Sequence, residues 1–412
     1  MRLLRAIANR RQASGSAPKA RPRNRLFSPR TYALIAVGFV ATAAGLAFGL
    51  RGEASDDATV SPQLRSLLQT AAGPLIVYRQ FDYESDTLWA ADPDDPARRI
   101  ELGQVEHAYG YGITPSLSPD GARIAYAVLP PEQEGLETNA ELWLLEVAGG
   151  ERRKLAEGID GAVTPVWSPD SGAVAVRRGE WREDTTNTEL FRVDVSGGET
   201  KLAEAYDHDL HPIDFSPDGA WLYYASVSLD TDLVRVAASG GRSVPLARLD
   251  PLAREWRLSP DGQHLAYLAP GPVEGIAAYE VQVLDLATGA VATPLAGRRV
   301  SQFAPVWEPA GGLTVGWTDM STMNTAPLRL TADGAVANAP AAPLPGRAGS
   351  SGMDAPISWS PDGVHLAIRA FESGDPVAGG PSRVVVLSTD GRRLELSRSA
   401  DVVIAGWLEG AP

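Results

Sequence analysis

A four-residue segment, Ser-Pro-Asp-Gly, recurs along the sequence and limits its possible folds more than any other feature. Complete copies begin at Ser118, Ser216, Ser259 and Ser360, and altered copies begin at Ser168 and Glu308. Proline presets φ at the second position of a turn, Asp suits the third, and Gly accepts φ > 0 where the chain reverses. Each copy therefore predicts a hairpin, at Pro119 and Asp120, Pro169 and Asp170, Pro217 and Asp218, Pro260 and Asp261, Pro309, and Pro361 and Asp362.

The residues around each turn describe a repeated unit of four strands. A large apolar residue precedes every turn (Leu117, Trp167, Phe215, Leu258, Trp307 and Trp359), and an alternating apolar strand follows it. A third strand then leads to a glycine turn, at 149–150, 197–198, 240–241, 288–289, 333–334 and 390–391, before a short fourth strand. The turn prolines are 43 to 52 residues apart. A period of this length made of strands predicts propeller blades.

The two ends of the repeat region complement each other. The first unit, from residue 73, has three strands where the others have four, and Val402–Trp407 resembles an innermost strand without its turn. Trp407 follows Trp359 by 48 residues, which is the spacing of the repeat. We predict that this C-terminal strand completes the first blade and closes an all-β, seven-bladed propeller over 73–412, because closure removes free sheet edges. A six-bladed ring, with one unit packed otherwise, is the alternative.

The N-terminal 50 residues predict a membrane anchor. Residues 1–30 contain nine Lys and Arg and no acidic residue, and residues 31–50 contain no charged side chain. Twenty uncharged residues can span a bilayer as a helix, and the positive flank orients the N-terminus toward the cytosol. We expect a basic cytoplasmic arm (1–30), a transmembrane helix (31–50), a linker with two helical turns (51–72) and an extracytoplasmic propeller. A cleavable signal peptide ending near Gly52-Glu53-Ala54 is the alternative.

Charge and cysteine content exclude several functions. From residue 31 onward, 37 − 9 = 28 Lys and Arg stand against 51 Asp and Glu, a net charge of −23. Nucleic-acid binding needs clustered cations, so an acidic propeller argues against it and suits cationic ligands or basic partners. The sequence has no cysteine, which excludes disulfides, thiolate metal sites and a catalytic thiol.

The repeated aromatic-Ser-Pro-Asp-Gly-strand pattern resembles that of the TolB-type propellers, over roughly 340 of the 412 residues. This repeat is found in the periplasmic Tol-Pal component and in the propeller halves of prolyl-oligopeptidase-like peptidases. The resemblance implies the propeller fold. The sequence departs from TolB itself because it has an apparent anchor and no room for the α/β domain that precedes the TolB propeller.

The five histidines are the first candidates for a metal site or a ligand-binding site. His264 and His365 share one repeat position with Arg123 and Trp221, which predicts packing roles. His107, with Tyr109 and Tyr111, and the segment Asp207, His208, Asp209 and His211 lie on loops that enter innermost strands. We predict that these seven residues bind a ligand at the mouth of a central channel, without a cofactor. A metal held by His107, His208 and His211 is the alternative, since some pectin-degrading lyases with this repeat hold a metal through histidines.

Other catalytic motifs do not occur. The sequence has no Gly-x-Ser-x-Gly nucleophile motif, Gly349-Ser350-Ser351-Gly352 has the wrong spacing, and no phosphate-binding glycine loop is present. Acidic and aromatic residues are interleaved in the variable loops, which suits a protein partner, a small ligand or a carbohydrate. We therefore predict a non-catalytic protein-interaction or ligand-binding module in the bacterial cytoplasmic membrane. The alternatives are a metal-dependent carbohydrate-active enzyme and a structural subunit of a membrane complex.

Overall fold

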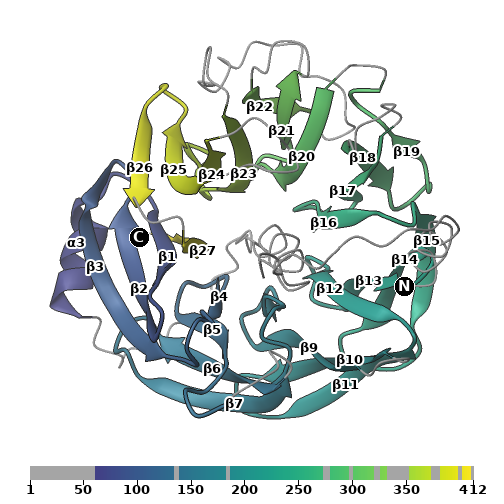
Figure 1. Cartoon of the computed structure of the whole chain (residues 1–412), viewed down its shortest axis with the longest axis horizontal. Helices are drawn as coiled ribbons and strands as arrows, with labels where there is room; N and C mark the ends of the chain where they lie inside the picture. The colour runs from purple at the N-terminus through teal and green to yellow at the C-terminus, as the bar shows by residue number, and fades with distance from the viewer. Residues whose placement is uncertain are drawn as a thin grey trace, which may run out of the picture. The chain divides into compact units, whose positions relative to one another are not determined.

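The fold is a ring of seven antiparallel sheets, each of which forms one blade (Figure 1). The computed structural model describes residues 61–133, 139–181, 186–271, 279–296, 300–319, 325–331, 352–372, 381–397 and 401–409. Seven blades are present, as the repeat spacing predicts, and the six-bladed alternative is wrong.

The blades follow one another along the chain, and in each blade the first-named strand lies nearest the centre of the ring. Blade 1 contains β27 (Val402–Leu408), β1 (Leu75–Phe81), β2 (Ser85–Asp92) and β3 (Asp95–Glu106). Blade 2 contains β4 (Thr114–Leu117), β5 (Arg123–Val128), β6 (Ala140–Glu146) and β7 (Arg152–Ile159). Blade 3 contains β8 (Val166–Trp167), β9 (Ala173–Trp181), β10 (Thr186–Asp194) and β11 (Glu199–Tyr206). Blade 4 contains β12 (Asp209–Phe215), β13 (Trp221–Val227), β14 (Thr231–Ala237) and β15 (Val244–Leu249).

The remaining three blades complete the ring. Blade 5 contains β16 (Arg254–Leu258), β17 (His264–Pro270), β18 (Tyr279–Asp285) and β19 (Val291–Ala292). Blade 6 contains β20 (Val300–Trp307), β21 (Leu313–Asp319) and β22 (Thr325–Leu330), and its expected fourth strand lies outside the described residues. Blade 7 contains β23 (Met353–Trp359), β24 (His365–Phe371), β25 (Ser382–Ser388) and β26 (Arg393–Ser397).

The C-terminal strand closes the ring, as predicted. Strand β27 pairs antiparallel with β1, with Trp407 opposite Ile76. The Trp407 ring is buried between blades 1 and 7, where it packs in a cluster with Ile357 and Val386. Its indole Nε1 donates to Ser358 Oγ of blade 7 at 3.0 Å, which satisfies the polar atom of a buried aromatic side chain. One strand therefore joins the first and last blades of the propeller by backbone pairing and by side-chain packing.

The repeated turns owe their shape to their own side chains. In the first copy, Ser118 Oγ donates to Asp120 Oδ1 at 2.5 Å and accepts from the backbone N–H of Arg123 at 2.9 Å. Gly121 has φ +70°, a conformation that few residues other than glycine adopt readily. In the altered copy at Glu308, the carboxylate instead forms an ion pair with Arg329. These turns are structural elements whose polar side chains are engaged locally.

A helix precedes the first blade, in the segment expected to be a linker. Helix α3 (Pro62–Thr70) begins at Ser61, whose Oγ accepts from the N–H of Leu64 at 3.2 Å. Leu64 and Leu67 are buried in one cluster with Leu102 of β3. Part of the linker therefore belongs to the packed propeller. The predicted transmembrane segment 31–50 lies outside the described residues, and no helix within the described part is long and apolar enough to cross a bilayer.

Candidate functional site

The two faces of the ring differ in the length and exposure of their loops. Antiparallel strand order places the Ser-Pro-Asp-Gly and glycine turns on one face, and the other connections on the opposite face. We call the second face the loop face. Among the described residues, the five most exposed large apolar side chains all lie in loop-face connections or at the strand ends beside them: Leu229 (92%), Tyr109 (70%), Tyr206 (69%), Leu252 (63%) and Tyr83 (60%). Exposed apolar groups gathered on one face are typical of binding surfaces.

The first cluster of buried charge lies between blades 1 and 2. Asp86, at the start of β2, is fully buried and accepts from the backbone N–H of Ile113 at 2.6 Å. Arg79 Nη1 donates to Asp86 Oδ1 at 3.3 Å, and His107 Nε2 lies 3.4 Å from the same oxygen. Three groups, one from β1 and two from the connection between β3 and β4, thus converge on one carboxylate. Asp86 fixes the loop that leads into β4.

The pKa of His107 reflects this environment. Burial by itself lowers the pKa of the imidazole, but its interactions with Asp86 and with the carbonyl of Ala108 outweigh burial, and the pKa stands above the ordinary 6.5. Nδ1 of His107 lies 2.9 Å from the Ala108 oxygen. Nε2 faces the Asp86 carboxylate at 3.4 Å without a hydrogen bond, and the ring gains positive charge more readily than a free histidine.

Aromatic rings cover this cluster on the loop face. Phe81 stacks on His107, with ring centroids 5.7 Å apart, and Tyr83 meets the edge of Phe81 at 5.6 Å. Tyr109 stacks on Tyr83 at 5.5 Å. The sequence predicts Tyr109 and Tyr111 to be binding residues beside His107. Tyr109 is exposed and Tyr111 is half-buried.

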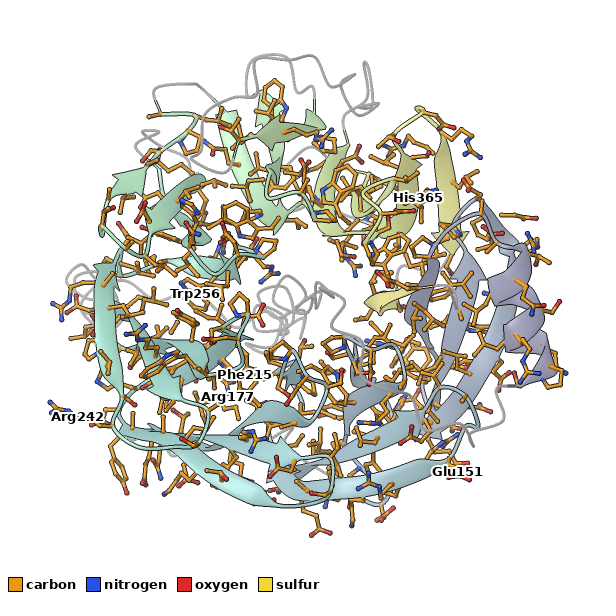
Figure 2. All side chains as sticks on the ribbon, turned by 180° about the vertical axis from the view of Figure 1, so that it is seen from behind. Glu151, Arg177, Phe215, Arg242, Trp256 and His365 are labelled. Atoms are coloured by element: carbon orange, nitrogen blue, oxygen red, sulfur yellow. The ribbon has the colours of Figure 1, made fainter. Side chains whose placement is uncertain are left out.

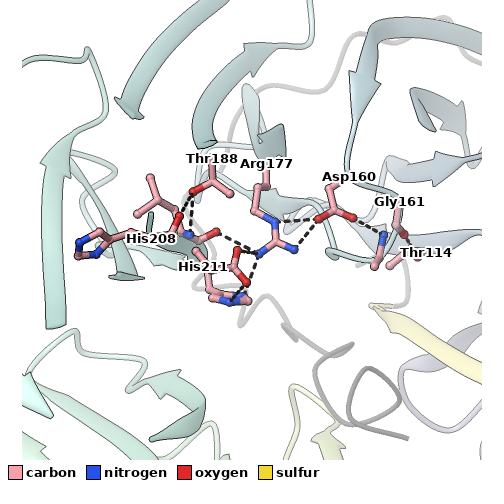
Figure 3. A network of polar contacts seen from close by, with 10 residues as sticks. Thr114, Asp160, Gly161, Arg177, Thr188, His208 and His211 are labelled. Carbon is pink, nitrogen blue, oxygen red and sulfur yellow. Dashed lines mark hydrogen bonds and ion pairs between the residues drawn. The ribbon is translucent and has the colours of Figure 1, made fainter. Parts of the chain in front are cut away.

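The second cluster lies between blades 3 and 4 and is centred on Arg177 of β9 (Figures 2 and 3). The buried guanidinium donates through Nε to Asp160 Oδ2 at 2.8 Å and forms an ion pair with the same carboxylate through Nη2. Its Nη1 donates to Asp209 Oδ1 at 2.5 Å, and it lies 3.3 Å from His211 Nδ1. His211 Nε2 in turn lies 3.1 Å from Asp209 Oδ2. Arg177 therefore joins its own blade to the innermost strand of the next.

The geometry of this cluster assigns the His211 proton and the Asp209 charge. Since Arg177 can only donate, Nδ1 of His211 accepts, which leaves the proton of the neutral ring on Nε2, facing Asp209. Burial raises the pKa of Asp209, but the hydrogen bond from His211 and the charge of Arg177 outweigh it and hold the pKa below the ordinary 3.8. In the pair formed by Asp209 and His211, Asp209 is thus the ionised residue.

A third group of charges lines the innermost strands of blades 4 and 5. Asp214 precedes Phe215, and Arg257 occupies the equivalent place before Leu258. Loss of water around Asp214 raises its pKa to about 7, in spite of the attraction of Arg257. Glu255 is buried with φ +56° and accepts from the N–H of Ala304 at 3.0 Å. This group links β12, β16 and β20 around the centre of the ring.

The structure keeps the three histidines of the metal alternative apart. His107 precedes β4 of blade 2, whereas His208 and His211 lie at β12 of blade 4, with blade 3 between them. Nδ1 of His208 contacts Ser226 Oγ at 2.9 Å, and Asp207 is exposed with φ +60°. Among the residues that the structure describes, no group of three or more His, Asp or Glu is arranged to hold a metal ion.

The other two histidines have the packing roles expected of their shared position. His264 lies over Trp307 and His365 over Trp407, each with ring centroids 6.3 Å apart. His365 Nε2 also contacts Asp94 Oδ1 at 3.1 Å, across the junction of blades 7 and 1. Repeat position alone identifies both roles.

Sequence reasoning missed the residues at the centres of these clusters. Arg177 and Arg369 are the ninth residues after the first residue of their turns, and Arg79 occupies the equivalent place in β1. Other blades have Ala127, Ala225, Leu268 or Trp317 there. A charged residue in an otherwise apolar strand position is the signal that the sequence offered. No comparable signal marks Asp86 or Asp160.

Part of this chain is similar in sequence to parts of two peptidases. No family model matches the chain. The uncharacterized peptidase YuxL of Bacillus subtilis is 28% identical over 158 residues, which cover 31% of this chain and 23% of that protein. Dipeptidyl-peptidase 5 of Porphyromonas gingivalis is 28% identical over 135 residues, 31% of this chain and 19% of that protein. The alignments thus span less than a quarter of each curated relative.

Solved structures share the fold at low identity. A prolyl endopeptidase has a TM-score of 0.54 and 15% identity, with coverage of 84% of this chain and 53% of that one. Oligogalacturonate lyase in complex with manganese has a TM-score of 0.52 and 14% identity, covering 79% and 85%. TolB from Acinetobacter baumannii has a TM-score of 0.44 and 19% identity, covering 64% and 62%. The fold is a seven-bladed β-propeller, as the repeat implied, and these solved structures share it at low identity.

The comparisons correct the functional prediction. These two curated relatives are named peptidases, which contradicts the prediction of a non-catalytic module that is not an enzyme. The prediction was wrong because it rested on missing catalytic motifs. A propeller that serves a peptidase need not carry the nucleophile, so the absence of those motifs does not exclude a role in catalysis.

Proposed function

We propose that this chain is the propeller part of a peptidase of the prolyl-oligopeptidase-like kind and that its loop face receives polypeptide substrate. The similarity of its repeats to two curated peptidases carries the proposal. The sequence has no Gly-x-Ser-x-Gly motif, so we assign the nucleophile to an α/β-hydrolase domain that is joined to the propeller or docks on it. The propeller then contributes substrate binding and positioning.

The loop face has the features that such binding requires. Its exposed apolar side chains offer contact area to an extended peptide. Below them, Asp86 and Arg177 hold the loops before β4 and β12 through buried hydrogen bonds, so the surface is formed before a ligand arrives. A preformed surface loses less conformational entropy when it binds.

Two measurements on the full-length protein test the proposal. We expect fluorescein-labelled oxidised insulin B chain, an unfolded polypeptide, to bind saturably in fluorescence anisotropy and to be displaced by unlabelled B chain but not by folded ubiquitin. We also expect membranes of the source cells to cleave the B chain in a fluorophosphonate-sensitive way, with less cleavage after deletion of the gene for this chain. Absence of binding together with unchanged cleavage would contradict the proposal.

We also propose that residues 31–50 anchor the protein in the bacterial cytoplasmic membrane with the propeller outside the cytoplasm. The support is the uncharged stretch of 20 residues and the nine positive charges before it. The protein should resist extraction by alkaline carbonate, and its propeller should be digested by protease added to spheroplasts. A protein that carbonate releases, or one that is protected in intact spheroplasts, would refute this topology.

A further inference from the structure

We propose that the exposed pair Tyr83 and Tyr109, with the carboxylates of Asp82, Glu84 and Glu106, binds a lysine or arginine side chain of a polypeptide. We call these five residues the tyrosine platform. The inference deepens the proposed function, on which it rests, because it names the class of substrate residue that the loop face selects. Three observations indicate a cationic side chain as the ligand. They are the geometry of the two rings, the unpaired negative charge around them, and the arginines that stack on other aromatic rings of the propeller.

The two rings form a preorganised aromatic surface. Their centroids are 5.5 Å apart and their planes differ by 24°, while 60% of Tyr83 and 70% of Tyr109 is exposed. The loops that carry them are joined by backbone hydrogen bonds, from Gly110 N–H to the Tyr83 oxygen at 2.8 Å and from His107 N–H to the Glu84 oxygen at 3.1 Å. Phe81 and His107 support the pair from beneath. Little ordering is needed when a ligand binds.

Unpaired negative charge surrounds these rings. Asp82 and Glu84 flank Tyr83 in the chain, and Glu106 pairs with Ser85 across the β2–β3 ladder. All three carboxylates are exposed, and none forms a salt bridge within the described part of the chain. Arg79 and His107, the nearest cationic groups in this stack, lie inward against Asp86. The surface therefore attracts cations.

Other aromatic faces of the propeller show what usually covers such rings. Arginines of the chain itself stack on Trp89, Phe191, Trp221 and Tyr279, at 3.6 to 4.3 Å from the ring centroids. Within the described residues, no Lys or Arg stacks on Tyr83 or Tyr109. A cation from outside completes the same interaction, since a guanidinium or ammonium is attracted to an aromatic face. The net charge of −23 from residue 31 onward adds a general attraction for basic segments.

Three capped pentapeptides test the inference on the full-length protein. They carry a central arginine, citrulline or norleucine between alanines, with a fluorescein label, so that only the charge and shape of one side chain differ. In fluorescence anisotropy at low salt, we expect the arginine peptide to bind about fivefold more tightly than the citrulline peptide, the size of one exposed cation–π contact with added charge attraction. This preference should decline as salt rises.

Variants locate the preference. Tyr83→Ala with Tyr109→Ala should bring the ratio of the two affinities to about one, and Asp82→Asn with Glu84→Gln should reduce it. Tyr206→Ala is the matched control. Tyr206 is equally exposed, but it lies on β11 of blade 3, where its hydroxyl donates to Glu204 of the same strand. If the double tyrosine variant has an altered melting temperature, Tyr109→Ala alone serves in its place. A preference that survives loss of the rings, or that the control variant also loses, would overturn the inference.

Other outcomes separate this inference from the proposed function. If the three peptides bind equally well, polypeptide binding stands and the tyrosine platform does not select cations. If no pentapeptide binds, the inference fails, whereas the proposed function is decided separately by binding and cleavage of the insulin B chain. Displacement of the arginine peptide by cellohexaose would show that the rings stack on a saccharide, and it would also overturn the inference.

Discussion

The junction between blades 1 and 2 and the junction between blades 3 and 4 hold their loops by different chemistry at matching positions. Asp86 of β2 and Thr188 of β10 are equivalent, because each lies two residues before the residue that pairs with Arg79 or Arg177. Thr188 Oγ1 donates to the His208 oxygen at 2.8 Å and accepts from the Leu210 N–H at 3.1 Å, with no charge involved. Asp86 performs the same task with a buried carboxylate that needs cationic neighbours.

The arginines at the two junctions have correspondingly different roles. Arg79 and Arg177 occupy equivalent places, yet Arg79 is one of three groups around Asp86, whereas Arg177 is itself the centre to which Asp160 and Asp209 bind. Repeat position therefore sets where a polar group is needed. The local partners decide which residue cannot be removed, because a buried charge is costly when it loses its counter-charge.

The largest expected effect is at Asp86. Asp86→Ala removes the carboxylate that Arg79 and His107 contact and leaves the Ile113 N–H without an acceptor, so we expect the free energy of unfolding to fall by ~3–5 kcal/mol. Thr188→Ala, the matched variant, removes a neutral cap and should cost ~1–2 kcal/mol. Urea unfolding followed by tryptophan fluorescence measures both. Equal losses would show that the two junctions do not differ as described.

At the two arginines, we expect the larger loss of stability at the junction of blades 3 and 4, which is the reverse of the order expected for Asp86 and Thr188. Arg177→Met leaves the buried Asp160 without its ion pair and should cost ~3 kcal/mol, whereas Arg79→Met should cost ~1–2 kcal/mol because His107 and the Ile113 N–H still contact Asp86. Methionine preserves most of the side-chain volume in both variants, so the two variants lose a similar amount of packing and differ mainly in the lost charge. A greater loss at Arg79 would reverse the assignment of the two centres.

A smaller contrast is expected between two histidines. His107→Ala removes a buried ring that stacks on Phe81 and should cost ~2 kcal/mol. His208→Ala removes a half-buried ring with one contact, to Ser226, and should cost less than ~1 kcal/mol. Thermal unfolding of the two variants under identical conditions compares them. A larger shift for His208→Ala would point to a role of that side chain beyond the Ser226 contact.

The pH dependence of the two junctions should have opposite signs. The raised pKa of His107 contributes stability that is complete below its ordinary value of 6.5 and is lost as the pH rises through the value in the folded protein. The lowered pKa of Asp209 contributes stability that is complete above 3.8 and is lost as the pH falls through the value in the folded protein. Hydrogen exchange, corrected for the intrinsic rate, should therefore show 107–113 opening on the alkaline side and 207–213 on the acidic side.

Variants identify the groups responsible. His107→Gln should remove the alkaline opening of 107–113, and Asp209→Asn should remove the acidic opening of 207–213. If both segments opened together at one pH, the two junctions would not titrate independently.

The candidate site was only partly predictable. His107 and His208 lie in connections of the loop face, but His211, expected on a loop, lies within β12, and blade 3 separates His107 from the other two. Sequence spacing identifies the loop of each residue, whereas the distance between loops depends on the number of intervening blades and on side-chain direction. Asp86 escaped prediction because its partners His107 and Ile113 are more than 20 residues away in the chain.

Ring closure was predictable for a physical reason. A repeat with a missing inner strand at one end and a spare strand at the other permits one arrangement that leaves no unpaired edge, and β27 beside β1 is that arrangement. The turns were equally predictable, since the Ser118 hydroxyl and the Asp120 carboxylate bond within the turn and Gly121 accepts its positive φ.

The sequence by itself determined the strand period, the turn geometry, the blade number and the acidic surface, because each depends on neighbouring residues or on composition. Only the tertiary structure decided which charges are buried together, as at Asp86 and Arg177, and which aromatic rings remain open to a ligand, as at Tyr83 and Tyr109. Burial and ion pairing depend on chain segments from different blades, and the energy of a buried charge is set by all of them at once.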